Sequence, residues 1–156
     1  MHRTERTFVL ISTLLMGLVL SRFAISKLTA WEISVQAFIE MARPLGLDPT
    51  LFRITTGILI LIVFLSYLVT AFLTVAKNKL KRLQTYNYYN FTFLANVLGL
   101  MTMVGALLAE FFLREQPKWL LVYIAIGIIL CSAINVWLTI NKTSFNLAIV
   151  KSKINA

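Results

Sequence analysis

Four long apolar runs constrain this chain more than any other feature of its sequence. They cover residues 8–28, 51–76, 91–113 and 119–140, and each is long enough to cross a hydrocarbon core of about 30 Å as a helix, which takes about 20 residues. Hydrophobic residues make up 59% of the chain, against about 45–50% in soluble globular proteins, so lipid must solvate part of this surface. The sequence therefore predicts an all-α integral membrane four-helix transmembrane bundle, with residues 1–156 forming one membrane domain.

Charge is divided unevenly between the segments that connect the runs. The N-terminus, the second loop and the tail carry nine basic residues and a single acid, Glu5, whereas the first and third loops with their flanks carry five basic and five acidic residues. Under the positive-inside rule the first set lies in the cytoplasm. We therefore expect a bacterial inner-membrane protein with cytoplasmic N- and C-termini. Because the net charge of +9 arises from these flanks and not from one soluble face, no nucleic-acid partner is expected.

The first loop carries a helical pattern of its own. Its apolar residues recur at helical spacing between polar ones: Trp31, Val35, Phe38, Ile39 and Ala42. This pattern predicts a short amphipathic helix over residues 31–42 that lies on the outer face or caps the bundle. Pro44 ends it, and Asp48 has the position of an N-cap for the second span. The basic tail 141–156 either extends the fourth helix or lies on the inner leaflet.

Cysteine and histidine are too scarce for most metal chemistry. Cys131 is the only cysteine and His2 the only histidine. Structural zinc needs four such ligands, and bis-histidine haem and cysteine-ligated iron–sulfur clusters need more than the chain has. We therefore expect no metal, no resident cofactor and no catalytic residues, while a bound quinone or lipid stays open.

Several charged residues lie within or beside the spans, where charge is costly. Arg22 lies about 6 Å past the middle of the first span, and Glu110 and Arg53 lie at similar depth in the outer halves of the third and second spans. One hypothesis is an outward-facing pocket made by these three residues and closed by the loop helix through Glu40. The alternative is a structural ion pair between Arg22 and Glu110 that fixes helix register. Lys27 projects from another face and is interpreted as an interface lysine.

Two amides lie in the opposite halves of the last two spans. Asn96 and Asn135 fall at similar depths in the third and fourth runs. Each amide needs a partner in lipid, so we expect a hydrogen bond between them across the two helices.

The order of these segments resembles the DoxX-like family of small four-span membrane proteins. The resemblance rests on SRFAISKL at 21–28, RPLGL at 43–47 after the loop helix, and MVGA at 103–106 followed by Pro117 before the last span. Gly57 and Ile58 stand where family members often carry an acid. The resemblance implies a four-span protein that works beside a partner, as in quinone-linked sulfur oxidation, oxidative-stress and receptor-assembly complexes.

Three functions remain open at this stage. The first is a non-catalytic subunit or assembly factor of a membrane complex, which we favour because the chain lacks redox ligands and offers docking surfaces. The second is a quinone- or lipid-binding enzyme subunit, for example of a quinone-linked oxidoreductase, and the third is a small transporter. Membrane lipids and either a protein partner or further copies of the chain are the expected partners.

Overall fold

The chain folds into four long helices and one short one, seen in a computed structural model that describes residues 3–76 and 82–154, with the side chains of 4–76 and 88–140. The long helices are α1 (Arg3–Leu28), α3 (Pro49–Ala76), α4 (Arg82–Phe112) and α5 (Trp119–Ile154). The short helix α2 (Glu32–Ala42) lies between α1 and α3 and continues into a 3-10 turn over Arg43–Leu45. No strand occurs in the described ranges, so the all-α prediction is confirmed.

Each long helix contains a segment able to span a membrane. These segments are Thr4–Leu28, Pro49–Ala76, Tyr88–Phe112 and Trp119–Ile140, which agree with the predicted runs to within a few residues. Large apolar side chains cover their outer surfaces, among them Leu18, Phe72 and Phe112. Water would not tolerate so much exposed apolar area, whereas lipid tails would. The chain is a small integral membrane protein.

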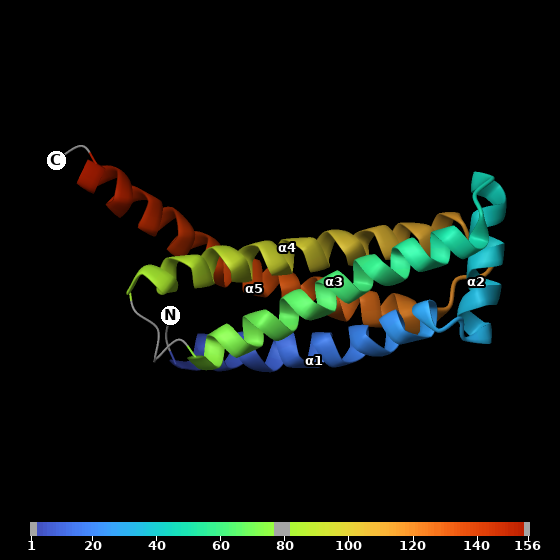
Figure 1. Ribbon diagram of the computed structural model, residues 1–156, viewed down its shortest axis with the longest axis horizontal. Coiled ribbons are helices and arrows are strands. Elements are labelled where there is room, and N and C mark those ends of the chain that lie inside the picture. Colours follow the sequence, from blue (N-terminus) through green and yellow to red (C-terminus); the bar gives the residue numbers. More distant parts are fainter. Residues whose placement is uncertain (1–2, 77–81, 155–156) are drawn as a thin grey trace.

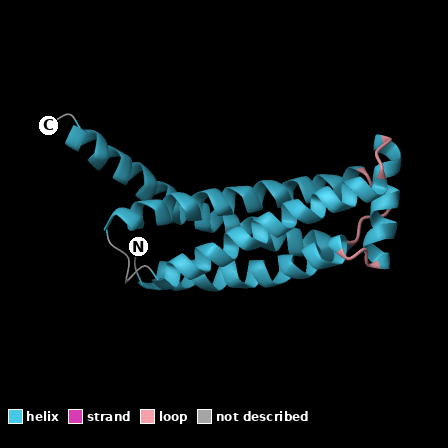
Figure 2. Ribbon diagram, in the orientation of Figure 1, coloured by secondary structure: helices cyan, strands magenta, loops and turns pink. Residues whose placement is uncertain are grey.

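The bundle has two different ends (Figure 1). The N-terminus, the end of α3 and the start of α4 gather at one of them, here called the terminal end, and α5 continues past it as a helix to Ile154. Helix α2 lies across the opposite end, here called the cap end, where the described loops also lie (Figure 2). Of the two alternatives for the tail, the structure therefore has a continuation of the fourth span.

Local signals at the cap end explain how α2 is joined to α3. Gly46 has a φ of 63° and ends the 3-10 turn in the left-handed conformation, which glycine adopts without steric cost. Asp48 Oδ1 then accepts a hydrogen bond from the backbone N–H of Leu51 at 2.6 Å, the expected N-cap arrangement. Proline follows as the first residue of α3, where its missing N–H is not needed.

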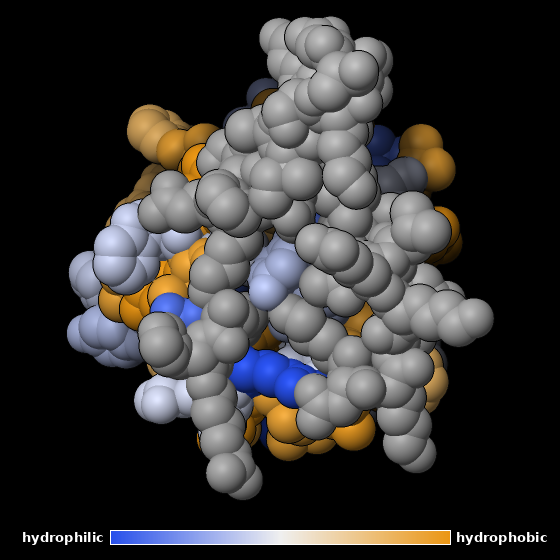
Figure 3. Space-filling model, turned by 90° about the vertical axis from the view of Figure 1, so that its left-hand side faces the viewer, coloured by the Kyte–Doolittle hydropathy of each residue, from blue (hydrophilic) through white to orange (hydrophobic). Residues whose placement is uncertain are grey.

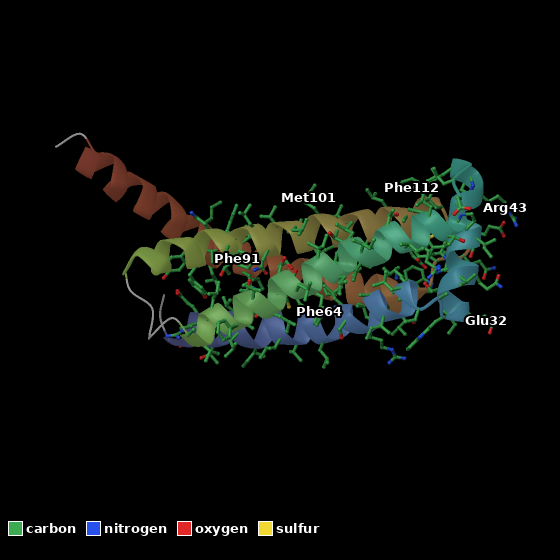
Figure 4. All side chains as sticks on the ribbon, in the orientation of Figure 1. Glu32, Arg43, Phe64, Phe91, Met101 and Phe112 are labelled. Atoms are coloured by element: carbon green, nitrogen blue, oxygen red, sulfur yellow. The ribbon has the colours of Figure 1, made fainter. Side chains whose placement is uncertain are left out.

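The four spans pack around a narrow apolar core. Its fully or nearly buried members come from all four helices and include Leu20, Val63, Tyr67, Met103 and Ile128. The spans are apolar around much of their circumference, and Figure 3, which looks onto the terminal end, shows apolar side chains around the rim of the described surface. In contrast, Glu32 and Arg43 project from the cap end (Figure 4).

Candidate functional site

The charged groups at the cap end are organised around Arg114, which lies in the loop two residues beyond the end of α4. Its Nη1 donates to Glu110 Oε1 at 2.8 Å, and its Nε lies 3.4 Å from Glu40 Oε2 on α2. The backbone N–H of Glu115 also donates to Glu40, at 3.1 Å. Glu110 and Arg114 are both buried, so each of these charges needs the other.

Glu110 also supports the start of α5. Its Oε1 accepts a hydrogen bond from the backbone N–H of Lys118 at 2.7 Å, and Lys118 is the residue whose carbonyl accepts the first backbone bonds of α5. A carboxylate at this position is favourable because the N-terminus of a helix carries unsatisfied N–H groups and a partial positive charge. The same side chain therefore fixes the end of one span to the beginning of the next.

Arg53 and Lys27 meet on the other side of the cap, between α1 and α3. The Arg53 guanidinium is buried and donates to the Lys27 carbonyl, one of the orphan carbonyls at the end of α1. The Lys27 ammonium lies 5.4 Å from the ring centre of Phe23 and 5.7 Å from that of Phe38. These are cation–π distances. Lys27, interpreted from the sequence as a lysine of the membrane interface, therefore also helps to hold α2 against the bundle.

The structure does not bring Arg22 to Glu110. Arg22 is exposed on the outer surface of α1, and Glu110 takes Arg114, four residues along its own chain, as its ion-pair partner. The expected pair is thus corrected to Glu110 with Arg114, which needs no approach between helices. The i,i+4 spacing of Glu110 and Arg114 was the sequence signal for this pair, although Arg114 itself lies two residues beyond the end of α4.

The structure does not form the predicted pocket of Arg22, Arg53 and Glu110, because none of the three lines either of the two open depressions at the cap end. Both depressions are lined in part by the Glu40–Arg114 bridge. The larger has a volume of about 640 Å³ and lies between α2 and the loop 114–118, with Glu32, Ile33, Gln36, Glu40 and Lys118 among its lining residues. The smaller, of about 300 Å³, is lined by Glu40, Arg43, Phe112 and Arg114 among others. Lys27 also lines neither of these two depressions.

A hydrogen-bonded network occupies the half of the bundle nearer the terminal end. Asn135 Nδ2 lies 3.0 Å from Asn96 Oδ1 and 2.9 Å from Ser12 Oγ, so the structure brings the two predicted amides together and adds a serine from α1. Asn96 Nδ2 donates to the Thr92 carbonyl at 2.8 Å. Both amides are fully buried, which is how such groups are tolerated inside a membrane.

Tyr67 extends this polar region to the third helix. Its hydroxyl lies 2.8 Å from Ser132 Oγ, and it fits against α4 because residue 99 is glycine: a Cβ there would overlap the Tyr67 hydroxyl. Nearer the terminal end, Arg6 Nε donates to the Thr74 carbonyl at 2.9 Å. Sequence reasoning missed Ser12 and Ser132, because serines are common in membrane helices and usually bond their own backbone.

An apolar layer separates this network from the charged cap. Leu20, Ile60, Met103 and Ile128 form it, one from each span, at roughly 12–16 Å from the cap ends of their helices at 1.5 Å per residue. Among the described residues, no group of three or more metal-binding side chains comes together.

Comparison with known proteins gave no match to a family model, to a curated protein or to a solved structure.

Proposed function

We propose that this chain is a non-catalytic subunit or assembly factor of a membrane complex, and that its partner binds the larger depression between α2 and the loop 114–118. The observation that carries the proposal is the way Glu40 holds α2. Its two oxygens accept from Arg114 Nε and from the Glu115 backbone, while Phe38 packs edge-on against Phe52 of α3 at 5.0 Å. The short helix is therefore fixed to α3 and to the loop between α4 and α5 before any partner arrives.

The fixed helix presents a surface suited to protein recognition. Ile33 is 73% exposed and lies in the depression among charged and amide side chains. An apolar anchor inside a polar rim is typical of protein interfaces. Because the surface is ordered in advance, little conformational entropy is lost on binding.

The other two functions receive less support from the same geometry. The carboxylates of Glu40 and Glu110 already accept hydrogen bonds from Arg114 and from loop backbone, which favours a role in holding the cap over a role in chemistry. A transporter needs a polar path across the bundle, and the apolar layer interrupts the polar groups between the network and the cap.

The resemblance to the DoxX-like family supports the same class of role, since it implies a four-span protein that works beside a partner. Membership of that family is part of the proposal, as are the bacterial inner membrane and the cytoplasmic termini.

The orientation in the membrane can be tested with single cysteines in a Cys131→Ala background, Ile33→Cys at the cap end and Thr4→Cys at the terminal end. A membrane-impermeant maleimide should label only Ile33→Cys in intact cells; labelling of Thr4→Cys alone would reverse the topology.

Photo-crosslinking in native membranes tests the partner site. A photoreactive residue at Gln36, inside the depression, should give one reproducible protein adduct, whereas the same residue at Leu47, exposed at the cap end but outside the depression, should not. Glu40→Gln should weaken the adduct by releasing α2. Deleting the chain should lower the amount of assembled partner. Identical adducts from both positions, or lipid adducts alone, would contradict the proposal.

A further inference from the structure

Two cations lie beneath α2 without an acidic partner of their own. Arg53 is only 7% exposed, and its hydrogen bond goes to a backbone carbonyl, that of Lys27. The Lys27 ammonium contacts aromatic rings. The two ion pairs described at the cap both involve Arg114, and neither Lys27 nor Arg53 takes part in them.

The charged residues of the two cap loops and their flanks balance overall, but those that are buried or half-buried carry one more positive than negative charge. Glu110 attracts Lys27, but its Oε1 is held by Arg114 and by the Lys118 backbone. Counting the buried and half-buried groups, the three cations Lys27, Arg53 and Arg114 face the two carboxylates Glu40 and Glu110. A net charge next to hydrocarbon is costly, and a bound monoanion would remove the cost.

An independent observation points to a ligand at the same place. Ser34 is 8% exposed and its hydroxyl has no hydrogen-bond partner, although buried polar groups are nearly always bonded. Ser34 lies one helical turn before Phe38, on the same buried face of α2. The Lys27 ammonium lies over the Phe38 ring, so the unpartnered hydroxyl of Ser34 and the Lys27 ammonium both lie on the side of α2 that carries Phe38.

We propose that Lys27, Arg53 and Ser34 bind the phosphate of an anionic phospholipid. Lys27 is the second-last residue of α1 and Arg53 the fifth of α3, so both lie near the membrane interface where lipid phosphates are found. Lysine and arginine both recognise phosphate, and serine can donate to it. Exposed apolar side chains of the same two helices, Ile25 and Leu51, offer a surface for the acyl chains.

This site is distinct from the partner surface of the proposed function. Its polar groups lie on the buried face of α2 and between α1 and α3, whereas the depression opens toward the loop 114–118. Lipid binding at the phosphate site can therefore be measured without a protein partner bound in the depression.

Thermal unfolding of the full chain in neutral detergent tests the proposal. Phosphatidylglycerol at about a hundredfold excess over its Kd should raise Tm by about 5–10 °C, whereas phosphatidylcholine with the same chains and inorganic phosphate should have little effect. Lys27→Gln and Arg53→Gln should reduce the shift. Arg22→Gln is the matched control, because it removes an exposed arginine from the same span and should leave the shift intact.

If Lys27→Gln and Arg53→Gln fold poorly, Ser34→Ala still tests the proposal. Removing an unpartnered buried hydroxyl should raise Tm without lipid, yet it should weaken phosphatidylglycerol binding about tenfold if the hydroxyl donates to the phosphate. An unchanged lipid shift in Ser34→Ala, an equal shift with phosphatidylcholine, or an equal loss in Arg22→Gln would each overturn the proposal. A full shift with inorganic phosphate would replace the lipid with a free anion and overturn the lipid assignment.

Discussion

Removing the Asn135 amide should destabilise the bundle about twice as much as removing the Asn96 amide. The difference follows from the geometry of the network, in which Asn135 is the shared partner. Its Nδ2 donates to Asn96 Oδ1 and to Ser12 Oγ, so Asn135→Leu breaks bonds to two other helices. Asn96→Leu breaks only one bond between helices, because the remaining hydrogen bond of Asn96 goes to a carbonyl of its own helix.

The magnitudes come from hydrogen bonds measured inside membrane proteins. Each bond between helices contributes about 0.6 kcal/mol on average and about 1.7 kcal/mol at most. Because both amides are fully buried, an orphaned partner finds no water, and values in the upper half of that range are expected. Asn96→Leu should therefore cost about 1 kcal/mol and Asn135→Leu about 2 kcal/mol. The double variant should cost no more than Asn135→Leu, because the bond that both residues share is already lost.

Reversible unfolding in mixed detergent micelles measures these free energies. Leucine resembles asparagine in size, so packing changes little. Thr102→Val is a suitable control on α4: its hydroxyl bonds only the Leu98 carbonyl of the same helix, and its loss should change stability by a few tenths of a kcal/mol at most. A larger loss for Asn96→Leu than for Asn135→Leu, or additive losses in the double variant, would refute the reasoning.

Two further predictions concern the packing of the core and the ion pair of the cap. Gly99→Ala should lower the free energy of unfolding by about 1–3 kcal/mol, because its Cβ would displace the buried tyrosine of α3; Gly105→Ala, whose Cβ meets nothing within 4 Å, should be neutral in the same assay. Glu110→Leu should cost about 3 kcal/mol by leaving Arg114 with a weaker partner, and adding Arg114→Leu should recover part of that loss. Arg22→Leu should combine additively with Glu110→Leu, and strong coupling between those two would contradict the corrected pairing.

The spans could be predicted from length alone, and the amide pair from equal depth together with the need of each buried amide for a partner in lipid. Span length follows from bilayer thickness, and counting residues from the helix ends placed Asn96 and Asn135 at one level. Depth does not determine the rotation of a helix about its axis. α1 is apolar on nearly every face, so no hydrophobic stripe indicated that Arg22 would point outward. At about 9 Å from the end of the helix, its long side chain can reach the interface without a partner.

The cap illustrates the other limit of sequence reasoning. The amphipathic pattern predicted α2 and singled out Glu40 as the acid that meets the charged cluster, but not that its partners would be Arg114 and the backbone of Glu115. That contact depends on how residues 113–118 close between two spans, and on Arg114 lying one turn from Glu110 while facing Glu40. Ser34 gave no sequence signal at all, since its significance lies in a missing partner that only packing reveals.

The apolar layer gives the two ends of the bundle separate roles. Toward the terminal end, polar groups from all four spans bond one another within the chain, as Asn135 does with Ser12 and Asn96, and changes there act on stability. At the cap end, the buried and half-buried charges are only partly balanced, Ile33 is exposed, and the Ser34 hydroxyl has no hydrogen-bond partner. Since Leu20 and the other members of the layer separate the two regions by more than a turn of helix, a variant at the cap should alter binding while leaving the network intact. If the cap binds a partner or a lipid as proposed, exposed cap residues such as Ile33 are where recognition can change without breaking the polar network of the bundle.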